Sequence, residues 1–273
     1  MLRKTELDRL CAFVIAAARE ELMSRFEHVS AACKDDGSVI TEADLAMQDR
    51  LQRELSAQWP AFALLGEEMA ASEQEALLAD PGRGLWCLDP LDGTSNFAAG
   101  IPFFGVSLAL IQDGAVQAAV VYDPVREECF SALRGGGAWL NGAPLRTSGV
   151  PESLADAMAM VDLKRLPGPL IRALATGAPY RSQRSFGSVA LDWCWVACGR
   201  CQVYLHGGQK LWDYAAGQLI ATESGAVGGL LHSYDSAWLD QLTLTPRIAV
   251  AAGSAELLHK WRNWIGGVLA AAP

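Results

Sequence analysis

The sequence has no excess of basic residues and no long apolar run. Its 22 lysines and arginines stand against 31 aspartates and glutamates, which gives a formal net charge of −9. Binding to nucleic-acid phosphates depends on basic side chains, so we expect no nucleic-acid partner. The longest apolar stretch near the N-terminus, residues 10–18, is too short for a membrane span and is followed at once by Arg19 and Glu20. It also lacks the basic segment and cleavage site of a signal peptide, so we expect no membrane association.

Cysteines with metal-type spacing are also missing. The 7 cysteines are scattered, and their odd number does not favour a disulfide framework. Cys198 and Cys201 form one Cys-x-x-Cys pair, but no histidine or second pair completes a zinc set. A redox or zinc role for this pair stays open beside the alternative of buried thiols. The cysteine usage indicates a reducing compartment, and we expect a cytoplasmic protein.

Repeats, low-complexity segments and long linkers are absent from the 273 residues. With 51% hydrophobic residues the chain can bury a sizeable core, which excludes intrinsic disorder. We therefore expect a single unit over residues 1–273, made of an N-terminal half (1–147) and a C-terminal half (148–273), with the functional site between them.

Helical spacing dominates the beginning of the chain. Thr5 and Asp8 resemble a capping box, and apolar residues then recur every three or four positions as far as Phe26. A second helix is predicted to begin at Thr41, with an acid three positions later, and to end near residue 59 because Pro60 follows.

The pattern changes at residue 85. Short β-rich runs cover residues 85–88, 104–111, 115–122 and 129–133, and Asp113-Gly114 predicts a hairpin between two of them. After Pro151 we predict strands at 158–161, 201–205 and 247–251, and helices at 169–176, 188–198, 210–224 and 255–269. This order favours a mixed α/β (α+β) fold of stacked layers over a helix bundle or an all-β sandwich.

The most informative segment is residues 86–97, where an apolar strand ends in two aspartates three positions apart. Asp89 follows the strand, Pro90 bends the chain, and Asp92 returns toward the same point. Two carboxylates that converge in this way suit Mg²⁺, which prefers oxygen ligands. Gly93 lets the backbone approach a ligand, and a helical turn that begins there would turn its amides toward an anion. The alternative is a turn in which both aspartates cap backbone amides.

Two further acids stand in the same kind of position. Glu67 follows the apolar run 62–65, and Asp213 stands in the first turn of a predicted helix rich in small residues. Because each acid lies at the end of an apolar element, the set as a whole favours a metal site over an isolated turn.

These motifs resemble those of the inositol monophosphatase family, which belongs to the Li⁺-sensitive, Mg²⁺-dependent phosphatases. The resemblance rests on residues 66–68, 89–97 and 212–217, extends to residues 34–44, 141–142 and 184–188, and so covers nearly the whole chain. It implies the layered α-β-α-β-α sandwich of the sugar phosphatases. It also implies a homodimer, to which Phe103, Phe104 and Trp195 are candidate contributors.

The resemblance further implies a set of metal ligands and catalytic residues. Glu67, Asp89 and the carbonyl of Leu91 would bind one Mg²⁺. Asp89, Asp92 and Asp213 would bind a second, and a weaker third ion would lie near Glu67. Asp44 would hydrogen-bond the hydroxyl of Thr94, and Thr94 with Glu67 would position the attacking water. The alternatives from the residues alone are a helix cap for Asp44 and a turn hydroxyl for Thr94.

The substrate positions follow from the same resemblance. His206 stands where inositol-specific members carry a glutamate, so it either lines the site or contacts the substrate, and Val189 stands where an alanine is frequent. Arg181 and Arg184 either meet a second phosphate or are solvated. The expected substrate-binding residues are Gly93, Thr94, Gly187, Ser188, Val189, His206 and Asp213. A mobile loop with Lys34, Asp35 and Ser38 is expected to close over the metals.

The function that this pattern predicts is hydrolysis of a small polyol or sugar phosphate, similar to inositol 1-phosphate, by metal-activated water. The same chemistry on a nucleotide 3′(2′),5′-bisphosphate, fructose-1,6-bisphosphate or histidinol phosphate is the first alternative. An alternative of another class is a regulatory interaction protein that retains the fold, which loss of a metal ligand would have favoured. None of the expected ligands is lost.

Overall fold

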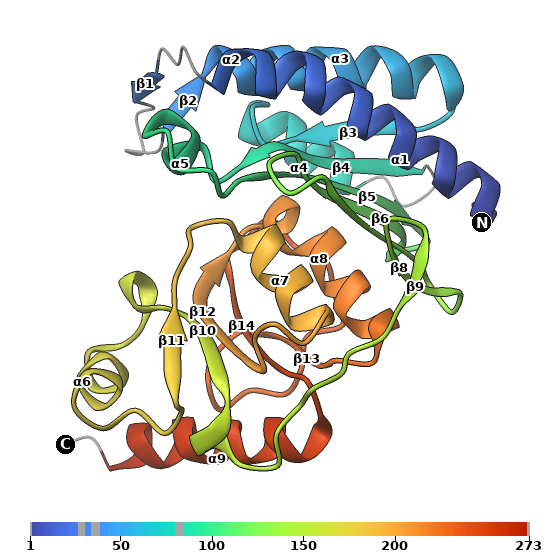
Figure 1. Cartoon of the computed structure of the whole chain (residues 1–273). Coiled ribbons are helices and arrows are strands. Elements are labelled where there is room, and N and C mark those ends of the chain that lie inside the picture. The colour runs from blue at the N-terminus through green and yellow to red at the C-terminus, as the bar shows by residue number, and fades with distance from the viewer. Residues whose placement is uncertain (1, 27–30, 34–38, 80–83, 272–273) are drawn as a thin grey trace.

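The computed structural model describes the whole chain except residues 1, 27–30, 34–38, 80–83 and 272–273. Helices and sheets alternate in layers from the N-terminal helices to α9 (Figure 1). The outer layer contains α1 (Lys4–Ala18), which continues through a π-helical turn (Arg19–Met23) into α2 (Ser24–Phe26), together with α3 (Glu42–Gln58). A short ribbon, β1 (Ala31–Cys33) with β2 (Val39–Thr41), connects α2 to α3.

The start of α1 differs from the prediction. The helix begins at Lys4, and Glu6 rather than Asp8 closes the cap by accepting a hydrogen bond of 2.9 Å from the Arg3 amide. The prediction that Thr5 and Asp8 form the cap is therefore wrong by two residues. The apolar face is confirmed, because Leu7, Leu10, Val14, Ala18 and Leu22 are fully or almost fully buried. The predicted start of α3 at Thr41 is confirmed.

The second layer is a seven-stranded sheet with the order β3-β4-β5-β6-β7-β8-β9. Its strands are β3 (Ala63–Gly66), β4 (Leu85–Asp92), β5 (Gly105–Gln112), β6 (Ala115–Asp123), β7 (Glu128–Leu133), β8 (Gly137–Leu140) and β9 (Ala143–Leu145). Only β3 and β4 run parallel; the other neighbours are antiparallel. The predicted hairpin is confirmed, since Asp113 and Gly114 both adopt positive φ angles (53° and 71°).

Strand β4 is longer than the predicted run, which stopped at residue 88. It continues to Asp92, with a shift of register against β5 between Asp89 and Asp92. Pro90 lies within this irregularity and cannot donate a ladder hydrogen bond, so the strand bulges there instead of ending. The bulge is what brings the second aspartate to the end of the strand.

The fourth layer is a five-stranded sheet with the order β11-β10-β12-β14-β13. Its strands are β10 (Met158–Asp162), β11 (Ser182–Arg184), β12 (Val203–Gln209), β13 (Val227–Leu231) and β14 (Arg247–Ala252). β10, β11 and β12 are parallel, whereas β14 is antiparallel to β12 and β13. The helices α6 (Gly168–Gly177) and α9 (Ala255–Ala270) lie at the outer side of this sheet (Figure 1).

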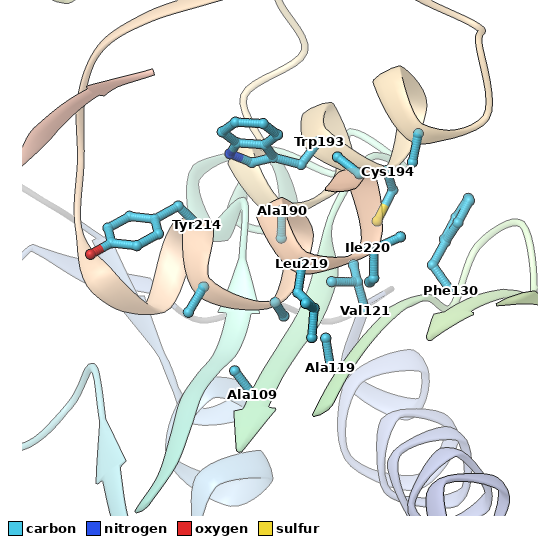
Figure 2. Packing of buried hydrophobic residues seen from close by; sticks show 14 of the residues in the cluster. Ala109, Ala119, Val121, Phe130, Ala190, Trp193, Cys194, Tyr214, Leu219 and Ile220 are labelled. Atoms are coloured by element: carbon cyan, nitrogen blue, oxygen red, sulfur yellow. The ribbon is translucent and has the colours of Figure 1, made fainter. Parts of the chain in front are cut away.

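The middle layer consists of α7 (Val189–Ala197) and α8 (Leu211–Ser224), which lie between the two sheets (Figure 1). Cys194 of α7 packs with Leu219 and Ile220 of α8 over the apolar face of the seven-stranded sheet, where Val121 is labelled in Figure 2. Trp193 of α7 faces the other way and contacts Tyr204 of β12, with ring centroids 5.2 Å apart. These side chains are 5% exposed or less, so burial of apolar surface holds the layers together. The two sheets with flanking helices confirm the expected layered α/β fold.

Four short elements complete the description: α4 (Ala71–Leu78), α5 (Thr94–Ala98) and two 3₁₀ turns, Leu154–Asp156 and Leu163–Arg165. Within the described part of the chain, no helix combines the length and hydropathy that crossing a bilayer requires.

Candidate active site

Glu67 and Asp89 leave the seven-stranded sheet at the same edge. Gly66 stands opposite Leu88 in the parallel pairing of β3 and β4, and the Glu67 amide donates to the Leu88 carbonyl at 3.1 Å. A Cβ at position 66 would lie 2.2 Å from the side chain of Gln48, which explains the glycine before the acid. The pairing therefore fixes the two acids on adjacent strand ends.

Asp89 and Asp92 are almost fully buried, at 2% and 7% exposure. One oxygen of Asp89 accepts a hydrogen bond of 3.0 Å from the Leu91 amide, so the alternative of an amide-capping turn is partly realised. Gly93 follows with a φ of 96° and serves as the N-cap of α5. This left-handed conformation lets the chain turn directly from the strand into the helix that carries Thr94.

Asp92 lies against the N-terminus of α7. Its Oδ2 accepts hydrogen bonds of 2.6 Å from both the Ser188 hydroxyl and the Ala190 amide. Since a helix N-terminus favours an anion, these contacts hold the carboxylate in one orientation. Ser188 is fully buried, its backbone included. Gly187, with a φ of 81°, is exposed beside it.

Asp213 is brought to this edge from the far side of the sequence. It lies in the first turn of α8, where its Oδ2 accepts a hydrogen bond of 2.8 Å from the Lys210 amide. The neighbouring Trp212 carbonyl accepts a hydrogen bond of 2.8 Å from Ser107, which pairs with Asp89 across β4 and β5. Ser107 thus ties α8 to the strand that carries the first acids. Sequence reasoning missed it, although a lone hydroxyl within the apolar run 104–111 was a usable signal.

Burial and mutual repulsion dominate the electrostatics of the acids at this edge. Burial raises the pKa of Asp89 well above its usual value, and repulsion from Glu67, Asp92 and Asp213 adds to the shift. Burial and the proximity of Asp92 raise the pKa of Asp213 to about 8. Burial also raises the pKa of Asp92, despite its donors at α7. Burial and repulsion therefore favour the protonated forms of these three aspartates.

A divalent cation would relieve this repulsion, and the donors are of the right kind. Carboxylates and the Leu91 carbonyl are the hard oxygen ligands that Mg²⁺ prefers. In the described part of the chain, however, no three acidic, histidine or cysteine side chains are close enough together to form a complete metal-binding group. The residues fit Mg²⁺ in the chemistry of their donors, and side-chain movements would be needed to bring them around one ion.

Asp44 and Thr94 are in direct contact. Asp44 is 1% exposed; its Oδ2 accepts from the amide and hydroxyl of Thr41 at 2.8 and 2.6 Å, while its Oδ1 lies 3.1 Å from the Thr94 hydroxyl. The cap and the contact with Thr94 are thus both present, on different oxygens. Thr94 also lies 2.8 Å from the Leu91 carbonyl, so its single proton has two possible acceptors.

The other expected substrate residues are more scattered. Val189 is half-buried at the start of α7, and Arg181 and Arg184 are exposed. His206 is 5% exposed, and both of its ring nitrogens already have partners in the protein: Asp162 at 3.1 Å and the Gly208 amide at 3.2 Å. The loop residues Lys34, Asp35 and Ser38 lie outside the described residues.

The Cys-x-x-Cys pair lies at the opposite end of α7 and has no metal-binding partners among the described residues. Burial raises the pKa of Cys201 to about 12 and raises the pKa of Cys198 as well, so both remain thiols near neutral pH. The alternative of buried thiols accounts for them.

A hollow of about 320 Å³ lies at the C-terminal end of α8, next to Gln218, Glu223 and Asp240. It contains none of the four acids. Because Asp213 stands at the opposite end of the same helix, this hollow is separate from the candidate active site.

Alternating helix and sheet layers, with acids at the ends of β3 and β4 and in the first turn of α8, define a class of layered α/β proteins with neighbouring carboxylates at one sheet edge. Comparison with known proteins narrows this class. A sequence model of the inositol monophosphatase family matches residues 5–264, and the chain belongs to that family of metal-dependent phosphatases.

Individual relatives agree with this assignment. Inositol monophosphatase 1 of Solanum lycopersicum is 32% identical over 244 residues, which are 83% of this chain and 86% of the relative. Nus factor SuhB of Pseudomonas aeruginosa is 36% identical over 227 residues, 75% of this chain and 77% of the relative. The solved structure of extragenic suppressor protein SuhB from Bartonella henselae has a TM-score of 0.80 at 29% identity, over 95% of this chain and 98% of that one.

Proposed function

We propose that this protein is a Mg²⁺-dependent phosphomonoesterase for a small polyol or sugar phosphate of the inositol 1-phosphate type. The observation that carries the proposal is the proximity of Asp89 to Glu67, Asp92 and Asp213, whose mutual repulsion a bound cation would relieve. Family membership and the relatives named inositol monophosphatase support it. The 1–147 half would supply most of the metal ligands, and the 148–273 half Asp213 and the substrate contacts.

The expected metal ligands are retained in this proposal. Glu67, Asp89 and the Leu91 carbonyl would hold one Mg²⁺, and Asp89, Asp92 and Asp213 a second, with room for a third ion near Glu67. When bound, the ions would activate water, neutralise the phosphoryl oxygens and stabilise the leaving oxygen.

Asp44 and Thr94 would orient the attacking water. If the Thr94 hydroxyl donates its proton to Asp44, the lone pairs of the Leu91 carbonyl stay available for a cation. The Thr94 oxygen can then accept a hydrogen bond from the water, with Glu67 as a second acceptor. The two acceptors near Thr94, at 3.1 and 2.8 Å, support this exchange of partners. The phosphate would lie against the backbone at the half-buried Gly93 and the exposed Gly187.

Release of phosphate from p-nitrophenyl phosphate, with and without Mg²⁺, tests the reaction. We expect turnover that requires the ion, and a subsequent screen of small phosphate esters would identify the substrate. Nucleotide bisphosphates, fructose-1,6-bisphosphate and histidinol phosphate belong in that screen. A protein that releases no phosphate at any Mg²⁺ concentration would refute the proposal.

A regulatory function is the second candidate. It is supported by the 36% identity to a relative named Nus factor SuhB. The phosphatase assay separates the two candidates. A purely regulatory protein would release no phosphate from the ester.

We further propose a cytoplasmic homodimer. All the cysteines that can be described are free thiols, which suits a reducing compartment. Phe103 stacks on Phe186, and both meet Trp195 edge-on, with ring centroids 4.7 to 5.2 Å apart. The buried Trp195 Nε1 has no hydrogen-bond partner among the described residues. This aromatic cluster is a candidate contact. The expectation for Phe104 is wrong, because it is fully buried against Phe26 and Phe97 in the core. Sedimentation would test the dimer.

A further inference from the structure

Three parallel strands end at one edge of the five-stranded sheet. β11, β10 and β12 are neighbours in this order, and Asp162, the last residue of β10, stands opposite His206 of β12. After β12 the chain passes through Lys210 directly into the first turn of α8, which carries Asp213. Ligands of parallel sheets bind outside the carboxyl ends of the strands. The Asp162–His206 pair therefore lies at the edge where a substrate of the four acids would place its alcohol half.

The contacts of His206 indicate which ring nitrogen carries the proton. The Gly208 amide donates to Nδ1 at 3.2 Å, so the ring proton is on Nε2, which lies 3.1 Å from Asp162 Oδ2. Both nitrogens are thus engaged, and only 6% of the side chain is exposed. A substrate hydroxyl would have to displace one of these partners to reach the ring. His206 is therefore poorly placed for direct contact.

Asp162 is the more accessible member of the pair, with 27% of its side chain exposed. Its Oδ1 accepts from the Lys164 amide at 2.9 Å, yet each carboxylate oxygen can accept a second hydrogen bond. The hydrogen bond from His206 lowers the pKa of Asp162, and Lys164 and Arg165 add to the effect, so the group is an anion near neutral pH. A partly exposed, oriented carboxylate is a strong acceptor for hydroxyl groups.

We propose that Asp162, held in place by His206, accepts hydrogen bonds from the hydroxyls of the substrate's alcohol half. His206 cannot accept these hydrogen bonds by itself, because both of its ring nitrogens are already engaged. Asp162 thereby selects phosphate esters of polyhydroxy alcohols, and His206 is a positioning residue. The inference rests on the proposed phosphatase function.

The test compares two esters, inositol 1-phosphate and p-nitrophenyl phosphate. The p-nitrophenyl group has no free hydroxyl, whereas inositol has several. Asp162→Asn keeps the side-chain size and an acceptor for Lys164 but removes the charge. We expect the ratio of kcat/KM for the two esters to fall by about tenfold, the size of one hydrogen bond to a charged group. The exposed Asp156→Asn, in a 3₁₀ turn remote from the strand ends, is the matched control and should leave the ratio unchanged.

The role of His206 has its own pair of variants. His206→Ala removes the donor to Asp162 and should lower the same ratio. His206→Gln, whose amide N–H can take the place of Nε2–H, should restore it. A merely structural histidine would not show this rescue. This pair also decides the question if Asp162→Asn fails to fold.

The outcomes are separable. A wild-type protein that hydrolyses neither ester overturns the proposed function together with the inference. A wild-type protein that hydrolyses both, with a ratio that neither Asp162→Asn nor His206→Ala changes, overturns the inference alone.

Discussion

The two sheets present their carboxylates in opposite electrostatic states. At the edge of the seven-stranded sheet, burial and mutual repulsion raise the pKa values of Asp89 and Asp213. At the edge of the five-stranded sheet, a hydrogen bond from His206 lowers the pKa of Asp162. In the first group burial and repulsion outweigh the favourable contacts, whereas in the second a hydrogen-bond donor outweighs burial. The difference teaches that similar side chains at strand ends can serve cation binding in one place and hydroxyl recognition in another.

Replacement of Asp89 by Asn is expected to have the largest effect among the tests of this comparison. Asp89 would be shared by two cations, so its loss should lower kcat/KM for p-nitrophenyl phosphate by at least about 10³-fold, typical of removing a major electrostatic contact in the transition state. Steady-state kinetics at saturating Mg²⁺ would measure the effect.

Asp113→Asn is the matched control for this change. Asp113 is an exposed acid in the hairpin turn, and asparagine tolerates its positive φ angle. We expect wild-type turnover from this variant. If Asp89→Asn retained the activity of the control, the bridging role of Asp89 would be wrong.

Added Mg²⁺ should stabilise the folded protein. The ion would neutralise buried carboxylates that repel one another in the native state, and binding at 100 times Kd contributes about 2.7 kcal/mol. For a chain of this size that corresponds to a rise in Tm of roughly 5–10 °C. Differential scanning calorimetry with Mg²⁺, then with Mg²⁺ and inorganic phosphate, would measure it. Asp89→Asn should show a smaller rise, and identical melting curves with and without the ion would contradict a metal site here.

Much of the fold was predictable because its elements carry local signals. The capping box at Thr41 and the Asp113-Gly114 turn are properties of a few neighbouring residues, and both are present. The cap of α1 and the end of β4 could not be predicted, because each depends on which of several competing partners forms the hydrogen bonds. Glu6 outcompetes Asp8 for the cap, and pairing with β5 extends β4 through Pro90.

The candidate site divides in the same way. Acids at the ends of apolar elements marked Asp89 and Asp213 in the sequence, and the fold brings them together. The contact of Asp162 with His206 joins residues 44 positions apart and has no local pattern. It follows from the parallel pairing of β10 with β12, which sequence periodicity cannot specify. Long-range partners of this kind therefore required the structure.

The smallest expected effect is a difference in acid stability at Asp162. Because its pKa is lowered in the folded state, the contact with His206 stabilises the fold above the unfolded value of about 3.9, and this contribution disappears as the pH falls through the lower native pKa. Asp162→Asn should therefore be less stable than wild type at pH 6, by about 1 kcal/mol, and equally stable in strong acid. Urea unfolding from pH 7 to pH 2 would measure the difference. A deficit that stayed constant over this range would show that packing, not charge, holds the pair, and the contrast between the two edges would then rest on the metal-binding acids alone.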